Sequence, residues 1–339
     1  MNLSELDYEL PEALIAQPPA AQRDKSRLLV VDRASCMIQE DVFANIANYF
    51  RAGDCIILNE TRVIRARLHA ARPSGGKAEI FLLHELAPGE WEALVKPSAK
   101  ILPGTTLRLG PVRATVEERV GSGRRRVVFN KPDVLKILEQ SGEVPLPPYI
   151  HRDKDDPNDG ERYQTIFAKE PGSVAAPTAG LHYTDAVFAA IAAKGVQRAT
   201  ITLHVGYGTF SPIRAERIEE HTLEPEVFTL PQQTADLINT TRAGGGRVIA
   251  VGTTTTRVLE SQFRDGKVQA GHGETSHYIY PPYTFRAVDV LQTNFHLPKS
   301  SLLALVYAFA GTDLARKAYA TAIAKRFRFY SYGDAMLIV

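Results

Sequence analysis

The stretch CIILNETRVIRARL, residues 55–68, decides the fold of this chain. Its apolar run CIIL is followed at once by Asn59, Glu60 and Thr61. In a sheet covered by helices, ligands bind beyond the carboxyl ends of the strands, where polar side chains converge. The stretch therefore predicts a strand that ends at a binding site.

Four more stretches have the same composition, in which a short apolar run ends in Gly, Thr, His or Asn. They are SVAAPTAGLHYT (173–184), ITLHVGYGTF (201–210), RVIAVGTTTTRVLES (247–261) and LQTNFHLPKSS (291–301). Glycine admits the close approach of a ligand to the backbone. Several such strand ends in one chain predict one composite site.

Composition limits the class of protein. The 339 residues leave room for about two domains, and the net charge of +2 means that any nucleic acid must be held by local patches. The two cysteines, Cys36 and Cys55, cannot form a disulfide framework, which favours a reducing compartment. The strongly apolar run 302–310 is too short to span a bilayer, and the start of the chain has no signal-peptide pattern. We expect a cytoplasmic protein without a membrane segment.

The pattern of apolar and turn-forming residues changes along the chain. Residues 67–130 form short strand-like runs separated by PSGG, APGE, LPGT and GSG, as in a small antiparallel barrel. Elsewhere, apolar strands alternate with helical spacing, which favours a mixed sheet covered by helices. The helical segments are DVFANIANYF, TDAVFAAIAAKG, RAERIEEHT, QTADLINTTRAGG and SSLLALVYAFAG. We predict an α/β domain of residues 1–66 and 145–339 and an inserted β-barrel domain of residues 67–144.

A family resemblance covers the chain from about Leu10 to its end. The motifs that carry it include LNETRVIRARL, VPLPPYI, GSVAAPTAGLHYT, TLHVGYGTFSPI, VGTTTTRVLES, YPPYTFRAVDVLQTNFHLPKSSLLALVYAFAG and FYSYGDAMLI, in this order. Together they closely resemble the S-adenosylmethionine:tRNA ribosyltransferase-isomerase family of queuosine biosynthesis. The fold of that family, an α/β domain interrupted by a β-barrel, is similar to the one predicted here.

The resemblance implies a reaction. The ribosyl group of S-adenosylmethionine would be transferred and isomerised onto the aminomethyl-deazaguanine at the wobble position of tRNA, giving epoxyqueuosine-tRNA, adenine and methionine. The implied partners are S-adenosylmethionine, as a consumed substrate and not a cofactor, and a tRNA with a GUN anticodon; no metal and no membrane is implied. One departure is visible: where the family usually continues with Met-His-Ser-Glu after His221, this chain has Leu223, Glu224, Pro225 and Glu226. Glu224 can still exchange protons or orient a cation.

Such a reaction needs a base, because the sulfonium acidifies neighbouring ribose hydrogens. An unperturbed imidazole titrates closest to neutral pH. The catalytic candidates are His182, His204, His221, His296 and Glu226. For any single histidine the alternative is a side chain that only hydrogen-bonds a loop.

Other groups of the substrate need other partners. Aromatic faces suit the sulfonium, a cation or a helix start suits the methionine carboxylate, and amides or carboxylates suit the purine edge. The candidates for the sulfonium are Tyr207, Phe210, Phe295 and Tyr332. Those for the carboxylate are Arg62 and Thr253–Thr256, and those for the purine edge are Asn59, Asn294 and Glu226. Further candidate contacts within the motifs are Thr61, Thr178, Gly180, Gly206, Gly208, Thr209, Thr253, Thr254 and Arg257. The alternatives are core aromatics and a plain helix cap.

Phosphate contacts need lysine and arginine. The run Arg124, Arg125 and Arg126 is predicted to lie on a hairpin, unbalanced by acids, although such a run can also protect an edge strand. The alternative set is Lys325, Arg326 and Arg328 at the end of a helix. Tyr283 or Phe285 would stack on the flipped base.

Two other functions have less support in the sequence. A conventional methyltransferase would carry its Gly-rich turn after the first strand, whereas GYG occurs late and is followed by TF. An RNA-binding module would leave the His and Gly motifs unexplained. No metal-binding spacing of Cys or His is present.

Overall fold

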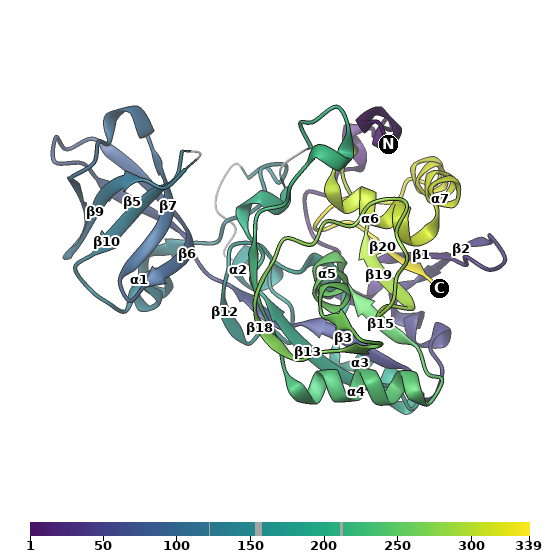
Figure 1. The fold of residues 1–339 in the computed structure, drawn as a ribbon. Helices are drawn as coiled ribbons and strands as arrows, with labels where there is room; N and C mark the ends of the chain where they lie inside the picture. Colours follow the sequence, from purple (N-terminus) through teal and green to yellow (C-terminus); the bar gives the residue numbers. More distant parts are fainter. Residues whose placement is uncertain (122, 153–157, 211–212) are drawn as a thin grey trace.

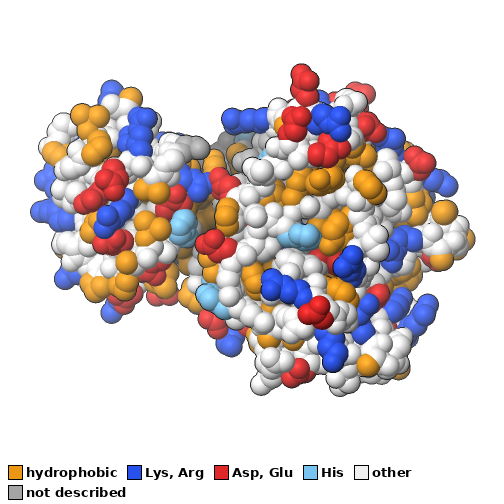
Figure 2. All heavy atoms as spheres, in the orientation of Figure 1, with side chains coloured by type: hydrophobic (Ala, Val, Ile, Leu, Met, Phe, Trp, Pro, Cys, Tyr) orange, Lys and Arg blue, Asp and Glu red, His pale blue; other side chains and the backbone are white. Residues whose placement is uncertain are grey.

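The computed structural model describes residues 1–121, 123–152, 158–210 and 213–339. Figure 1 shows two bodies, a larger one built around a mixed sheet and a smaller β-body beside it. On the face drawn in Figure 2, cationic and anionic side chains are interspersed over both bodies, as the balanced net charge would suggest.

The larger body contains a sheet that has nine strands among the described residues. Their order is β18-β14-β13-β3-β15-β19-β20-β1-β2. The bounds are β1 (Arg27–Val31), β2 (Ile38–Val42), β3 (Cys55–Asn59), β13 (Gln197–Leu203), β14 (Glu226–Leu230), β15 (Val248–Val251), β18 (Gly271–Thr275), β19 (Val290–Asn294) and β20 (Ala335–Ile338).

Four central strands of this sheet run in the same direction. β3 is parallel to both β13 and β15, and β15 is parallel to β19. β20 is antiparallel to β19, with Ala335 opposite Asn294. The carboxyl ends of the four parallel strands and the start of β20 therefore meet at one edge of the sheet.

Both faces of the sheet are buried at its central strands β3, β15 and β19, as expected for parallel strands covered by helices on both sides. Cys55 and Ile57 of β3 pack with the core that includes α4 (Gln232–Ala243), α5 (Thr253–Ser261), α6 (Ser301–Ala310) and α7 (Thr312–Ala324). Ile56 and Leu58 pack with the opposite core, which includes η4 (Phe43–Tyr49) and α3 (Asp185–Ala193). Successive side chains point to opposite faces, so one strand supplies both cores.

The smaller body is a closed antiparallel barrel. Its strands are β5 (Arg67–Ala71), β6 (Lys77–Ala87), β7 (Glu90–Lys96), β8 (Thr105–Leu109), β9 (Val112–Arg119) and β10 (Arg125–Phe129). Ladder pairs run in the order β5-β6-β7-β10-β9-β8, and Ala71 opposite Arg108 closes the ring. β11 (Gly142–Glu143) and α1 (Val134–Ser141) sit at the side of β5. A separate apolar core, which includes Trp91 and Ile80, fills this body.

The fold class predicted from the sequence is confirmed: a mixed sheet covered by helices, with a small inserted barrel. The domain boundaries at residues 66/67 and 144/145 stay a prediction. The helix expected in RAERIEEHT is wrong, because only the single turn η8 (Ile218–Glu220) forms there. The segment DVFANIANYF forms a 3₁₀ helix, η4. Among the described residues, no helix has the length and apolar character needed to cross a membrane.

Candidate active site

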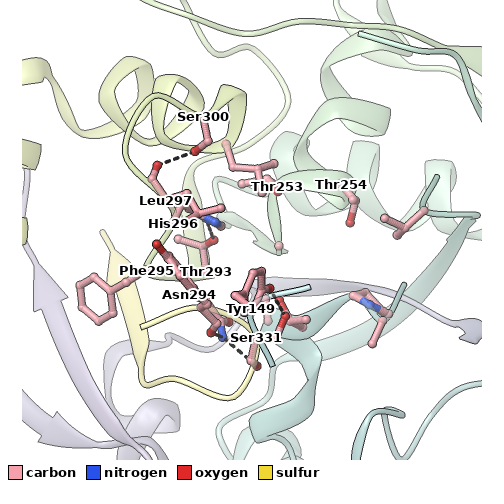
Figure 3. Close-up of a pocket in the computed structure, with 18 of the residues that line it drawn as sticks. Tyr149, Thr253, Thr254, Thr293, Asn294, Phe295, His296, Leu297, Ser300 and Ser331 are labelled. Carbon is pink, nitrogen blue, oxygen red and sulfur yellow. Dashed lines mark hydrogen bonds between the residues drawn. The ribbon is translucent and has the colours of Figure 1, made fainter. Parts of the chain in front are cut away.

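A pocket lies at the edge where the parallel strands end. It encloses about 770 Å³ of space not filled by atoms, part of it open to solvent. Its wall comes from the segments after β13, β15 and β19, from η6 (Thr178–His182), and from the turn before β20. Figure 3 shows polar side chains from these segments directed toward one another, among them Thr253, Thr293, His296 and Ser331. Four of the five stretches thus line one pocket, whereas no residue of 55–68 does; that the pocket is a binding site stays a prediction.

Asn294, at the end of β19, fixes the geometry of the pocket floor. Its Nδ2 donates to the carbonyl oxygens of Tyr330 (2.9 Å) and Ser331 (3.4 Å). These two carbonyls accept only, so they fix which end of the amide carries the nitrogen. The amide oxygen Oδ1 therefore faces Nε2 of His182, at 3.4 Å.

His182 is buried and has partners on both ring nitrogens. Because Oδ1 of Asn294 can only accept, Nε2 of His182 carries the proton, and Nδ1 accepts from the Ser26 hydroxyl (2.7 Å). Burial lowers the pKa of His182 to about 4. The ring is therefore neutral at neutral pH, and it joins η6, β19 and the segment before β1 rather than facing the pocket.

His296 has a different position, because it lines the pocket itself. Its Nε2 lies 2.8 Å from Oγ1 of Thr293, and Figure 3 shows the two side chains facing each other. Burial lowers the pKa of His296 to about 3, so the ring is neutral at neutral pH. Nδ1 has no hydrogen-bond partner among the described residues. Of the four histidine candidates, His296 is the one with a neutral ring in the pocket wall.

His204 and His221 do not line the pocket. Nδ1 of His204 lies 2.8 Å from Oγ1 of Thr61, and its ring packs against Gly172, where a Cβ would stand 2.8 Å from Cε1. Burial lowers the pKa of His204, although the charge of Glu170 acts in the opposite direction. His221 makes an edge contact with Tyr278, and burial lowers its pKa too.

Helix α5 begins at the pocket. Thr253 and Thr254 line the wall, and Gly252 precedes them with a φ of 90°, a conformation that favours glycine. The hydroxyls of Thr255 and Thr256 bond back to carbonyls of the preceding turn. The first N–H groups of a helix have no partner within it, so this end of α5 can receive an anionic or carbonyl group.

A second pocket adjoins the first one. Leu302 belongs to both walls. In the second pocket, Glu226 accepts from the backbone N–H of Gly206 (3.0 Å) and pairs with the guanidinium of Arg257, both charged side chains being buried. Glu224 lines the same pocket, and a Cβ at Gly208 would come within 2.8 Å of its Oε2.

Comparisons with known proteins show which family this chain belongs to. A family model described as "Queuosine biosynthesis protein" matches residues 3–338. The chain belongs to this family. A relative from Citrifermentans bemidjiense, named S-adenosylmethionine:tRNA ribosyltransferase-isomerase, is 51% identical over 341 residues and covers 100% of both chains. A protein of the same name from Aquifex aeolicus is 45% identical over 340 residues, again with 100% coverage of both.

A solved structure also matches over nearly the whole length. The crystal structure of an S-adenosylmethionine tRNA ribosyltransferase from Thermotoga maritima is 38% identical in sequence, with a TM-score of 0.58, and the match covers 99% of this chain and 100% of that one. The family predicted from the motifs and the predicted enzyme class, a transferase-isomerase of queuosine biosynthesis, are confirmed.

Several predicted site residues line the two pockets. The first wall contains Thr178, Thr253, Thr254, Asn294, Phe295 and His296, and the second contains Gly206, Gly208, Glu226 and Arg257. Others lie elsewhere. Asn59 bonds the backbone of Leu203, Arg62 is exposed beside the barrel, and Gly180 packs closely against Phe167. Whether these residues bind substrate stays a prediction.

The aromatic candidates are mostly placed away from the pocket. The ring of Phe295 packs within the core against Phe329 in a tilted arrangement (4.9 Å between centroids), and the hydroxyl of Tyr332 donates to Asp159 (3.3 Å). Tyr207 is half exposed and contacts Phe81 of the barrel. The side chains of Thr209 and Phe210 lie outside the described part of the structure. Whether this set contacts the sulfonium stays a prediction.

Sequence reasoning missed the aromatic pair that does line the pocket. Tyr149 and Tyr330 have ring centroids 4.7 Å apart, and the Tyr149 hydroxyl lies 2.6 Å from Oγ of Ser331. The sequence did contain both tyrosines within conspicuous motifs, since VPLPPYI and FYSYGDAMLI are among those that carry the family resemblance. What the motifs did not show is that these two segments meet.

The expectation that the arginine run is unbalanced by acids is wrong. Arg124 contacts Glu92 of β7 (3.2 Å) and also Glu224 of the larger body, and Arg126 pairs with a second acid of β7 at 2.7 Å. Arg125 is buried. The run does lie at a β9–β10 hairpin, but the charges of Arg124 and Arg126 are paired with acids that the sequence does not reveal as neighbours.

The pKa of His182 predicts a pH dependence of stability. Above the ordinary pKa of 6.5, neither the folded nor the unfolded state binds a proton here. As pH falls from 6.5 toward 4, the unfolded state binds one and the folded state does not, so stability is lost. The slope is roughly 1.4 kcal/mol per pH unit, or about 2 kcal/mol between pH 6.5 and 5.

Urea unfolding at pH 6.5 and at pH 5 tests this pH dependence. Between the two pH values, the free energy of unfolding of His182→Gln should fall by about 2 kcal/mol less than that of the parent protein. The exposed His151→Gln variant serves as the matched control and should behave like the parent. An equal pH loss in the parent protein and His182→Gln would contradict the assignment.

Proposed function

We propose that this chain transfers and isomerises the ribosyl group of S-adenosylmethionine onto the aminomethyl-deazaguanine at the wobble position of tRNA. Epoxyqueuosine-tRNA, adenine and methionine are the products, and S-adenosylmethionine is consumed rather than acting as a cofactor. Membership of the family over residues 3–338 supports the proposal. The observation that carries it is a neutral imidazole, His296, in a pocket that also holds an aromatic pair and the start of a helix. We place the reaction in the cytoplasm, where its tRNA substrate is.

Each pocket feature fits one need of this reaction. The sulfonium acidifies neighbouring ribose hydrogens, so Nδ1 of His296 can accept a proton, and the released electron pair can expel adenine. The ring is neutral at working pH and can accept a proton, but burial, which lowers its pKa to about 3, makes it a weaker base than one whose pKa lies near the operating pH. Tyr149 and Tyr330 offer aromatic faces to the sulfonium. Cation–π contacts of this kind contribute about 0.5–2 kcal/mol.

Isotope labels distinguish ribosyl transfer from methyl transfer, the rival reaction of S-adenosylmethionine. The protein is incubated with deazaguanine-modified tRNA and S-adenosylmethionine labelled either in the ribose or in the methyl group. We expect ribose label in the tRNA, and methyl label in free methionine together with released adenine. Methyl label retained on the RNA would exclude the proposed reaction.

The base is tested by substitution. His296→Ala should lower turnover by about two to four orders of magnitude, the range that a placed general base supplies. The melting temperature shows whether the variant is folded. His151→Ala, which removes an exposed histidine, is the control and should retain turnover. If His296→Ala retains turnover while His204→Ala loses it, the base is His204 instead.

The tRNA phosphates need cations that are not already paired. A surface hollow next to the turn 328–334 is lined by Lys25 and Arg326, by Arg27 and Arg328, which pair with Glu40 and Asp334, and by Asp334 itself. Lys25 and Arg326 are exposed and make no ion pair with any described residue. The same turn supplies Tyr330 and Ser331 to the catalytic pocket. This hollow therefore suits the backbone of a GUN anticodon arm better than the paired arginine run of the barrel.

Salt titration of tRNA binding tests the hollow. Each true phosphate contact removed should make the slope of log affinity against log salt shallower by roughly 0.7–1, so Lys25→Ala with Arg326→Ala should change it by about twice that. Arg126→Ala, whose charge is already paired with Glu90, should leave the slope unchanged. The reverse pattern would place tRNA on the barrel hairpin.

A further inference from the structure

The second pocket contains a buried guanidinium that is only partly satisfied. The side chain of Arg257 is 4% exposed, and one of its terminal nitrogens pairs with Glu226. Its Nε is buried and has no hydrogen-bond partner among the described residues. A buried donor without an acceptor is costly, and the cost is greater when the group is charged. Because Arg257 also lines the second pocket, an anionic ligand there can pair with its guanidinium.

The rest of the second pocket fits an amino-acid group. Leu302, Leu305 and Ile279 offer apolar surface, and the carboxylate of Glu224 reaches the wall from the other side. A planar guanidinium matches the geometry of a carboxylate, whereas carboxylates match an ammonium or another cation. The set therefore offers a guanidinium for a carboxylate and an apolar surface beside it, whereas the carboxylate of Glu224 is already paired with Arg124.

The two pockets are close enough for one ligand to occupy both. Leu302 belongs to both walls, Ser300 of the first is followed directly by Ser301 of the second, and Val205 is followed by Gly206 in the same way. A molecule that places its nucleoside beside His296 can thus extend an attached chain past Leu302 toward Arg257.

We propose that Arg257 binds the α-carboxylate of the methionine part of S-adenosylmethionine in this second pocket. The assignment rests on the proposed function and specifies how its substrate is held. It replaces the sequence-based candidate Arg62, which is exposed and lines a hollow beside the barrel. It also explains why Arg257 is held by Glu226, since that pair fixes the direction of the guanidinium before the ligand arrives.

The first measurement uses the unmodified protein and two ligands. Isothermal titration compares S-adenosylmethionine with its decarboxylated analogue, which keeps the adenosine, the sulfonium and the ammonium. We expect the analogue to bind about 10- to 100-fold more weakly, which is the effect of losing hydrogen bonds to a charged group. Equal binding of the two ligands would overturn the assignment while leaving the proposed reaction intact.

The second measurement assigns the preference to Arg257. The variant Arg257→Met with Glu226→Gln removes both charges, so no lone buried charge remains to unfold the protein. Arg257→Lys keeps a cation but not the planar fork. The preference is the ratio of the affinity for S-adenosylmethionine to the affinity for the decarboxylated analogue. We expect this ratio to fall to about 1 in the double variant, which has lost the charged hydrogen bonds, and to be reduced in Arg257→Lys. Arg62→Ala is the matched control and should retain the full preference.

The outcomes separate the assignment from the reaction. A folded double variant that still prefers S-adenosylmethionine would show that Arg257 only holds Glu226, and a preference lost in Arg62→Ala would move the carboxylate to Arg62. Either result overturns the assignment. An unmodified protein that binds neither ligand and releases no adenine with tRNA would contradict the proposed function, and the assignment with it.

Discussion

The side-chain amide of Asn59 holds together the ends of two parallel strands, and the arrangement of the sheet edge depends on this contact. Its Oδ1 accepts from the backbone N–H groups of Leu203 (3.0 Å) and Thr61 (3.1 Å), and its Nδ2 donates to the carbonyl of Leu203 (2.9 Å). The side chain thus joins the end of β3 to the end of β13 where the chain leaves for the barrel. Because all these groups are buried, each lost bond would leave a polar atom without water. His204 is the first residue after β13, so this contact also helps to fix its position.

Burial controls the chemistry of the site through protonation. Both His182 and His296 are kept neutral, although only His296 meets the pocket. The difference comes from their partners: His182 uses both ring nitrogens to join segments, whereas one nitrogen of His296 is left for a ligand. The arginines also differ in their partners. Arg257 is paired with a buried carboxylate at the second pocket, whereas Arg124 and Arg126 of the barrel hairpin pair with acids of the neighbouring strand.

The sequence predicted what depends on local pattern. The strand ends at Asn59 and Asn294 could be recognised because apolar runs stop there, and the barrel because its strands and turns are evenly spaced. Contacts between distant segments could not be recognised in this way. Tyr149 meets Ser331 across 182 residues, and the acids that neutralise Arg124 come from β7 and from the larger body. These depend on sheet register and on how the two bodies meet, neither of which has a local signature.

The barrel is joined to the larger body at places that matter for the pocket. The outgoing chain leaves at Thr61, whose hydroxyl holds His204, and the returning chain delivers Tyr149 to the pocket wall. A third contact, between Arg124 and Glu224, reaches the second pocket directly. The barrel is therefore in contact with, or connected by the chain to, an aromatic side chain of the first pocket, a histidine and an acid of the second pocket.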